Sequence, residues 1–156
     1  MQNSLPNSLH IFEDELYHPM HDCSISFVNW NVRSIPTNLQ TFLDLHYIDQ
    51  VFCDVISLCE TRLTTEIEKL YKLPNYTVFH QHRDRHGGGV SLFIKDTFKP
   101  KILPYMTYIC LDHIEVVSAN IEVDGKKVFI SSIYRPPSGD IELYLSKIEE
   151  MLLFLS

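Results

Sequence analysis

The chain contains 156 residues, of which 45% are apolar, 21% charged and 12% aromatic. This composition is typical of a globular domain and excludes collagen-like, low-complexity and intrinsically disordered proteins. The longest apolar runs, such as residues 151–155, are much shorter than the roughly 20 residues of a membrane-spanning helix. Residues 1–22 contain no Lys or Arg, so they do not resemble a secretory signal peptide. We therefore expect a cytoplasmic or nuclear protein without a membrane partner.

The net charge of −7 is unevenly distributed along the chain. Residues 1–22 contain four acidic residues and no basic one, and we expect them to form a flexible acidic leader. Residues 23–156 then contain 13 basic and 16 acidic residues, so local basic patches for a polyanion remain possible. The four cysteines form no Cys-x-x-Cys pair, which predicts reduced thiols rather than disulfides or zinc ligands.

The first part of the expected domain has the pattern of a strand, a helix and a second strand. Residues 24–31 form a short apolar run that suits a strand covered on both faces. Residues 34–46 have helical periodicity, and residues 51–59 form a second apolar strand. This unit makes the two strands parallel, so Asn31 and Glu60 follow strand ends at the same edge of the sheet.

The rest of the chain predicts antiparallel strands and a final helix. The expected elements are a short helix over 65–71, strands over 76–82, 90–95, 114–123 and 128–134, and a helix that begins near Asp140 with an apolar stripe from Leu143 to Leu155. A glycine-rich segment and an Asp-Gly pair join the strands into two hairpins. One parallel unit followed by hairpins predicts an α/β or α+β fold with a mixed sheet.

Glu60 is the first candidate for a functional side chain. It ends a buried strand, where an unpaired carboxylate is energetically costly. A Mg²⁺ ion fits this position, because Mg²⁺ takes one or two carboxylates together with water and phosphate oxygens. Pairing of Glu60 with Arg62 or Arg33 is the alternative explanation.

Two further segments carry groups that suit a phosphate. The Arg83–Gly89 segment combines arginines with flexible glycines, which can hold a phosphate or form a solvent-exposed turn. Tyr134 and Arg135 follow another strand, where they can contact a phosphate or a base, or form a rigid turn. The P-loop motif is absent, so we expect no nucleotide cofactor. The histidines within residues 80–86 have no further ligands at the usual zinc spacing.

Four motifs in the chain occur in the order and spacing of one family. They are Asn29-Trp-Asn-Val-Arg-Ser34, Ile56-Ser-Leu-Cys-Glu-Thr61, Arg85-His-Gly-Gly-Gly-Val-Ser-Leu-Phe-Ile94 and Ile133-Tyr-Arg-Pro-Pro137. Over residues 24–155 the chain resembles the endonuclease/exonuclease/phosphatase superfamily, in particular the endonuclease domain of non-LTR (LINE-type) retrotransposons. This resemblance implies a partial four-layer α/β sandwich with mixed β-sheets, and Mg²⁺-dependent cleavage of phosphodiester bonds in DNA.

The resemblance also assigns roles to individual residues. Asn31 matches the active-site asparagine that orients the phosphate and the attacking water, and Glu60 matches the acidic metal ligand. Tyr134 matches the tyrosine that contacts the scissile phosphate. Arg85 and Arg135 lie in the matching motifs and are candidate phosphate-binding residues.

Two later motifs of the family, similar to Gly-Asp-Phe-Asn and Ser-Asp-His, are not found. Gly139-Asp140 is followed by Ile-Glu, and Asp112-His113 precedes Tyr134 and is better explained as a turn. We therefore expect residues 23–156 to be the N-terminal part of a C-terminally truncated domain, with little or no nuclease activity. The alternatives are an inositol- or lipid-phosphate phosphatase of the same superfamily and a non-enzymatic binding module.

Overall fold

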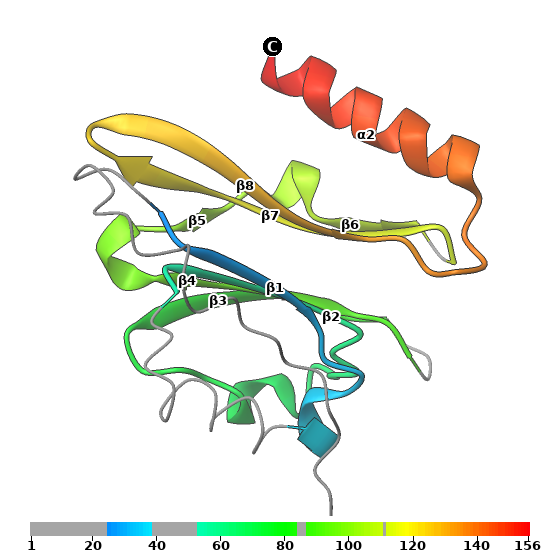
Figure 1. Cartoon of the computed structure of the whole chain (residues 1–156), viewed down its shortest axis with the longest axis horizontal. Coiled ribbons are helices and arrows are strands. Elements are labelled where there is room, and N and C mark those ends of the chain that lie inside the picture. Colours follow the sequence, from blue (N-terminus) through cyan, green and yellow to red (C-terminus); the bar gives the residue numbers. More distant parts are fainter. Residues whose placement is uncertain (1–24, 39–52, 84–86, 111) are drawn as a thin grey trace, which may run out of the picture.

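The computed structural model describes residues 25–38, 53–83, 87–110 and 112–156. In this part of the chain two β-sheets pack face to face, with helical elements on their outer sides (Figure 1). The helix α2, Ile141–Leu155, lies over one sheet, and the short helix η1, Glu68–Leu70, lies beneath the other. These layers confirm the predicted partial α/β sandwich, in which the first sheet is mixed and the second is antiparallel.

The first sheet has the strand order β1-β2-β4-β3. Its strands are β1, Phe27–Asn31; β2, Val55–Cys59; β3, Tyr76–Gln81; and β4, Val90–Lys95. β1 and β2 are parallel, as the strand-helix-strand pattern predicts, and β4 pairs antiparallel with both β2 and β3. The predicted helix of residues 34–46 begins at residue 35, and its part beyond residue 38 lies outside the described residues.

The second sheet is built around one long hairpin. Its strands are β5, Lys101–Ile102; β6, Tyr108–Cys110; β7, Ile114–Val123; and β8, Lys126–Tyr134. β5 and β6 pair with successive parts of β7, and β8 pairs along the other side of β7. Asp124 and Gly125 both have positive φ, as the predicted two-residue turn requires. β5 and β6 are not predicted from the sequence.

The helical elements differ in part from those predicted. The prediction of a helix over residues 65–71 is wrong. Only the 3-10 turn η1 forms there, because Pro74 disfavours a helical conformation of the residue before it. Two further 3-10 turns are η2, Asp96–Phe98, and η3, Pro104–Met106. α2 begins where expected, since the Asp140 carboxylate accepts hydrogen bonds from the first-turn N–H groups of Glu142 and Leu143 at 2.8 and 3.0 Å.

The strands alternate so that one face of each sheet lines a shared apolar core. This core includes Val55, Cys59, Val90, Leu92, Ile94, Val117, Ala119, Ile121 and Ile130. Phe93, Ile56 and Leu58 point to the opposite side of the first sheet, where they pack with Val32 and Ile35. Both cysteines whose side chains are described, Cys53 and Cys59, are buried free thiols.

Two apolar surfaces are exposed although the sequence predicts them to be covered. β1 is an edge strand that pairs only with β2 in the described part of the chain, so Phe27 remains 57% and Val28 37% exposed. On α2, the predicted apolar stripe from Leu143 to Leu155 is wider than the face that packs on the second sheet. Tyr144, Ile148 and Met151 pack on the second sheet. Leu145 and Leu152 are exposed because they lie beside this row, and Leu155 is partly exposed at the last residue of the helix.

The predicted acidic leader of residues 1–22 lies outside the described residues. Among the helices that are described, none has both the length and the apolarity that crossing a bilayer requires.

We expect the packing between the sheets to dominate stability. Leu92 is fully buried between them, and its replacement by alanine leaves a cavity, so L92A should lower the free energy of unfolding by about 2 to 5 kcal/mol. Leu70 is 75% exposed in η1, and L70A is the matched control, with a change within about 0.5 kcal/mol. Urea unfolding of the two variants measures both values, and equal losses would contradict this description of the core.

Candidate active site

The loops that follow β1 and β2 run side by side at one edge of the first sheet. The parallel pairing aligns Asn31 with Cys59. It continues beyond the strands, because Val32 N–H donates to the Cys59 carbonyl at 3.0 Å and Ser34 N–H donates to the Glu60 carbonyl at 2.8 Å. The sequence-based prediction that Asn31 and Glu60 share this edge is therefore confirmed.

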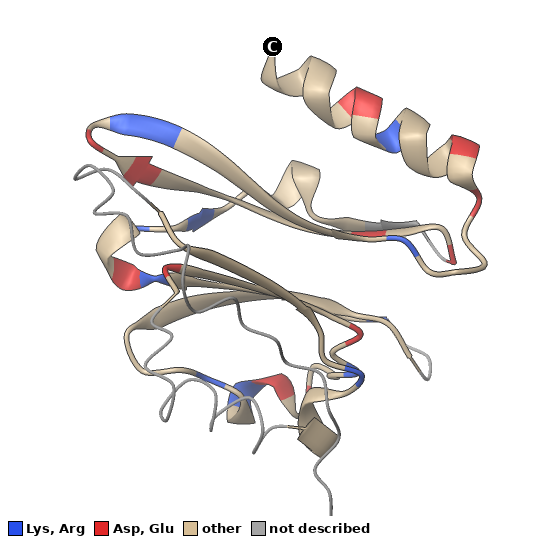
Figure 2. Cartoon of the chain, viewed as in Figure 1, with Lys and Arg blue, Asp and Glu red and all other residues tan. Residues whose placement is uncertain are grey.

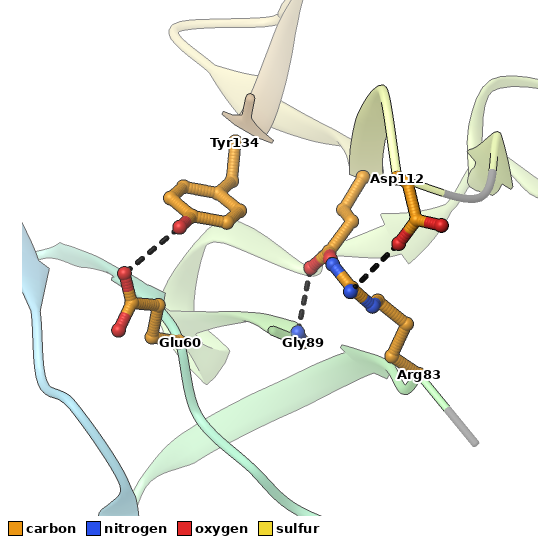
Figure 3. Close-up of polar contacts among 6 residues, drawn as sticks. Glu60, Arg83, Gly89, Asp112 and Tyr134 are labelled. Atoms are coloured by element: carbon orange, nitrogen blue, oxygen red, sulfur yellow. Dashed lines mark hydrogen bonds and ion pairs between the residues drawn. The ribbon is translucent and has the colours of Figure 1, made fainter. Parts of the chain in front are cut away.

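Three of the predicted site residues meet at one carboxylate oxygen. Oε1 of Glu60 accepts hydrogen bonds from the Asn31 Nδ2 amide and the Tyr134 hydroxyl, each at 2.8 Å. Tyr134 ends β8, so its side chain reaches Glu60 from the opposite sheet (Figure 3). No described residue donates to Glu60 Oε2, which leaves one oxygen of this half-buried carboxylate available.

These hydrogen bonds change the acid–base properties of both partners. The bonds from Asn31 and Tyr134 lower the pKa of Glu60, because they stabilise its charged form. Burial, together with the hydrogen bond to Glu60, raises the pKa of Tyr134 to about 12. At neutral pH the pair is therefore a carboxylate and a neutral hydroxyl that donates to it.

The backbone at Glu60 has an uncommon conformation. Glu60 has a φ of 55° and Arg62 a φ of 52°, both in the left-handed region that costs a non-glycine residue about 1 to 2 kcal/mol. Thr61 N–H donates to the Gly89 carbonyl at 3.1 Å, and Arg62 N–H donates to the Gly88 carbonyl at 2.9 Å. The glycine-rich segment before β4 therefore holds the loop that carries Glu60.

The donor set at Glu60 suits a hard cation bound largely by water. Among the described residues, no three His, Cys, Asp or Glu side chains gather closely enough to enclose a metal ion. A single carboxylate with one available oxygen fits Mg²⁺, which keeps several water ligands. Arg62 and Arg33 form no ion pair with Glu60 in the described structure, although their charges contribute to its lowered pKa.

The glycine-rich segment makes contacts that the sequence does not predict. Glu115 of β7 is fully buried and accepts a hydrogen bond from Gly89 N–H at 2.6 Å. Arg83 pairs with Asp112 at 2.9 Å (Figure 3) and with Glu115 at 3.0 Å. The Gly89 N–H and the Arg83 guanidinium, predicted as possible phosphate ligands, are thus bonded within the protein. Arg85 lies outside the described residues.

Glu115 is not among the site residues predicted from the sequence, although the alternation along β7 points to it. Alternation along β7 places Glu115 on the same strand face as Val117, Ala119 and Ile121, which line the core between the sheets. A carboxylate in such a row must be paired, because burial of an unpaired charge is costly.

Arg135 follows Tyr134 but turns towards the next segment of the chain. Its Nη1 donates to the carbonyl of Gly139 at 2.7 Å and thereby supports the turn before α2. The described structure contains no hydrogen bond between Arg135 and Glu60, so Arg135 is not brought into the hydrogen-bonded cluster.

His80 and His82 stack on one another, with their ring centroids 5.5 Å apart. His82 is hydrogen-bonded to Glu68, and Nδ1 of His80 is 2.7 Å from the Ser91 hydroxyl oxygen. Burial lowers the pKa of His80 to about 4, with a smaller contribution from His82. His80, His82, Glu68 and Ser91 therefore form a packed polar cluster on the first sheet.

Comparisons with known proteins find similarity in structure only. No family model matches the chain, and neither does any curated protein sequence. Similar solved structures include AP endonuclease LMAP from Leishmania major, with a TM-score of 0.56 and 18% identity over 81% of this chain and 45% of that one. TDP2 from D. rerio, in complex with a single-strand DNA product, has a TM-score of 0.53 and 18% identity over 83% of this chain and 53% of that one.

The catalytic domain of APE2 from Xenopus laevis has a TM-score of 0.50 and 17% identity over 70% of this chain and 45% of that one. These proteins belong to the endonuclease/exonuclease/phosphatase superfamily. The chain has the fold of this superfamily. It spans about half the length of these endonuclease/exonuclease/phosphatase structures.

The hydrogen bond from Tyr134 can be tested through the ionisation of Glu60. In Y134F one donor to the charged carboxylate is lost, so the pKa of Glu60 should rise towards its ordinary value of 4.5. Because the folded-state pKa is lowered, this contribution to stability is present above the unfolded-state pKa and is lost as the pH falls through the folded-state value. NMR titration of the Glu60 carboxyl carbon measures the shift. Y105F, at an exposed tyrosine, is the control, and an unchanged Glu60 pKa in Y134F would contradict the assignment.

The lowered pKa of His80 leads us to expect a separate pH dependence of stability. Its pKa is about 4 in the folded chain and 6.5 when unperturbed, so the unfolded chain binds the proton first as the pH falls. Stability should therefore decrease between about pH 6.5 and pH 4, and this decrease should be smaller in H80Q. Urea unfolding of both proteins across this range makes the comparison, and identical pH profiles would show that His80 is not buried in its neutral form.

Proposed function

We propose that this chain carries part of the active site of a Mg²⁺-dependent phosphodiesterase that nicks DNA, of the type found in non-LTR retrotransposons. The observation that carries the proposal is the convergence of Asn31 and Tyr134 on Oε1 of Glu60, with Oε2 left available. The three residues come from both sheets and occupy the positions that the family resemblance assigns to phosphate and metal binding.

In this proposal each residue has a defined part. Glu60 holds the metal ion through Oε2, while Asn31 and Tyr134 fix the orientation of its carboxylate by donating to Oε1. When bound, Mg²⁺ supplies stabilisation of negative charge on the phosphate. The Tyr134 hydroxyl carries one proton, so it can donate to a phosphate oxygen only by giving up its hydrogen bond to Glu60.

Two features support DNA as the substrate. The loops that carry Asn31 and Glu60 each continue to an exposed arginine, Arg33 and Arg62, which places positive charge beside the site (Figure 2). The similar structure of D. rerio TDP2 holds single-strand DNA. On the strength of the family resemblance we also propose Arg85 and Arg135 as phosphate ligands.

We further propose that the chain alone has little or no nuclease activity. The family resemblance assigns the activation of water to an aspartate in a later motif, and that motif is not found in the sequence. In the described structure Glu60 is the only carboxylate that Asn31 and Tyr134 contact. Metal binding and phosphate positioning can therefore be tested separately from catalysis.

The proposed metal site predicts a specific loss in one variant. Mg²⁺ titration followed by amide NMR should shift resonances of residues 31 and 60, and these shifts should be lost in E60Q because the substitution removes the anionic ligand. E122Q removes an exposed carboxylate at the far end of β7 and should leave the shifts unchanged. Equal Mg²⁺ responses in the two variants would contradict the site.

A nicking assay on supercoiled plasmid tests activity directly. The chain with Mg²⁺ should convert no more plasmid than the same sample with EDTA. Robust nicking that EDTA abolishes and E60Q lacks would overturn the proposed inactivity while supporting the active-site assignment. Release of phosphate from inositol or lipid phosphates without nicking would instead favour a phosphatase.

A further inference from the structure

A buried carboxylate in the second sheet contacts the loop system that carries Glu60. Glu115 has no exposed surface, and both of its carboxylate oxygens have partners. Oε1 is bound by Arg83 at 3.0 Å, and Oε2 accepts from Gly89 N–H at 2.6 Å. Since Glu115 belongs to β7 and Gly89 precedes β4, these bonds join the two sheets.

We propose that Glu115 is a positioning residue, whose buried carboxylate holds the Gly88–Gly89 segment and thereby fixes Glu60 at hydrogen-bonding distance from Tyr134. This inference deepens the proposed function and rests on it, because it concerns the same site. Glu115 itself does not touch the metal or the phosphate in this arrangement.

The first step of the argument leads from Glu115 to Glu60. Gly89 N–H is bonded to Glu115, and the carbonyl of Gly89 accepts from Thr61 N–H. The carbonyl of Gly88 accepts from Arg62 N–H. The glycine segment thus lies between Glu115 and the two residues that follow Glu60, so a displacement of this segment moves the Glu60 backbone.

The second step leads from Glu115 to Tyr134. Glu115 and Tyr134 are directly opposite one another in the pairing of β7 with β8. The carboxylate that binds the glycine segment is therefore carried by the strand position next to the tyrosine that binds Glu60. One side chain of the second sheet sets the distance of the first sheet from Tyr134.

The third step concerns the close fit around Gly88. A Cβ atom at residue 88 would lie 2.3 Å from Glu115 Oε1, and the φ of Gly88 is +73°. Only glycine allows the carboxylate to approach the segment this closely. Arg83 balances the charge of Glu115, so the segment, the carboxylate and the guanidinium form one buried unit.

Two double variants separate the hydrogen bond to Gly89 from the ion pair with Arg83. R83M/E115Q removes both charges but keeps a side-chain oxygen that can accept from Gly89 N–H. R83M/E115L removes both charges and the acceptor. Joint replacement of a buried pair is often tolerated, whereas removal of one partner leaves an uncompensated charge.

The readout is the nuclear Overhauser contact between the Tyr134 ring and the Glu60 side chain, measured without metal or nucleic acid. We expect R83M/E115Q to retain this contact and R83M/E115L to lose it, with E122Q as a further control that retains it. Equal contacts in the two folded double variants would overturn the proposal. If the leucine variant does not fold, the glutamine variant decides: loss of the contact there overturns the proposal, and retention supports it.

These outcomes are independent of the proposed function. Equal Mg²⁺ responses in E60Q and E122Q would count against the metal site. The contact between Tyr134 and Glu60 would still report on Glu115 in that case. Conversely, a Glu115 that does not affect the contact would leave the metal site at Glu60 intact.

Discussion

The hydrogen bond between Glu60 and Tyr134 is the contact on which the candidate site depends. The two residues are 74 positions apart: Glu60 follows β2 of the first sheet, and Tyr134 ends β8 of the second. They meet because the β7–β8 hairpin packs on the layer formed by β1, β2 and β4. The site is therefore a product of sheet packing, and local structure in either half is insufficient to form it.

Two glutamates at the interface between the sheets have opposite properties. Glu60 lies at the rim, half-buried, with one oxygen held by two donors and the other available. Glu115 lies inside, with both oxygens bonded to the protein. Glu60 therefore has an oxygen that can bind a ligand in place of water. Glu115 is suited to hold the glycine segment in place, because its charge is already compensated by Arg83.

Much of this arrangement can be predicted from the sequence, and there are physical reasons why the rest cannot. Parallel pairing of the first two strands predicts that Asn31 and Glu60 are neighbours, and the Asp124-Gly125 pair predicts the β7–β8 turn. β5 and β6 are too short to show an alternation of apolar and polar residues, so the sequence pattern does not predict them. The meeting of Tyr134 with Glu60 follows from family resemblance alone, because periodicity does not specify how one sheet packs on another.

The left-handed backbone at Glu60 has a consequence for how this sequence can change. Glycine adopts that conformation without the cost that glutamate carries. The backbone and the side-chain hydrogen bonds therefore favour different residues at position 60. A glycine would relieve the local strain, but it would also remove the acceptor that joins Asn31 of the first sheet to Tyr134 of the second.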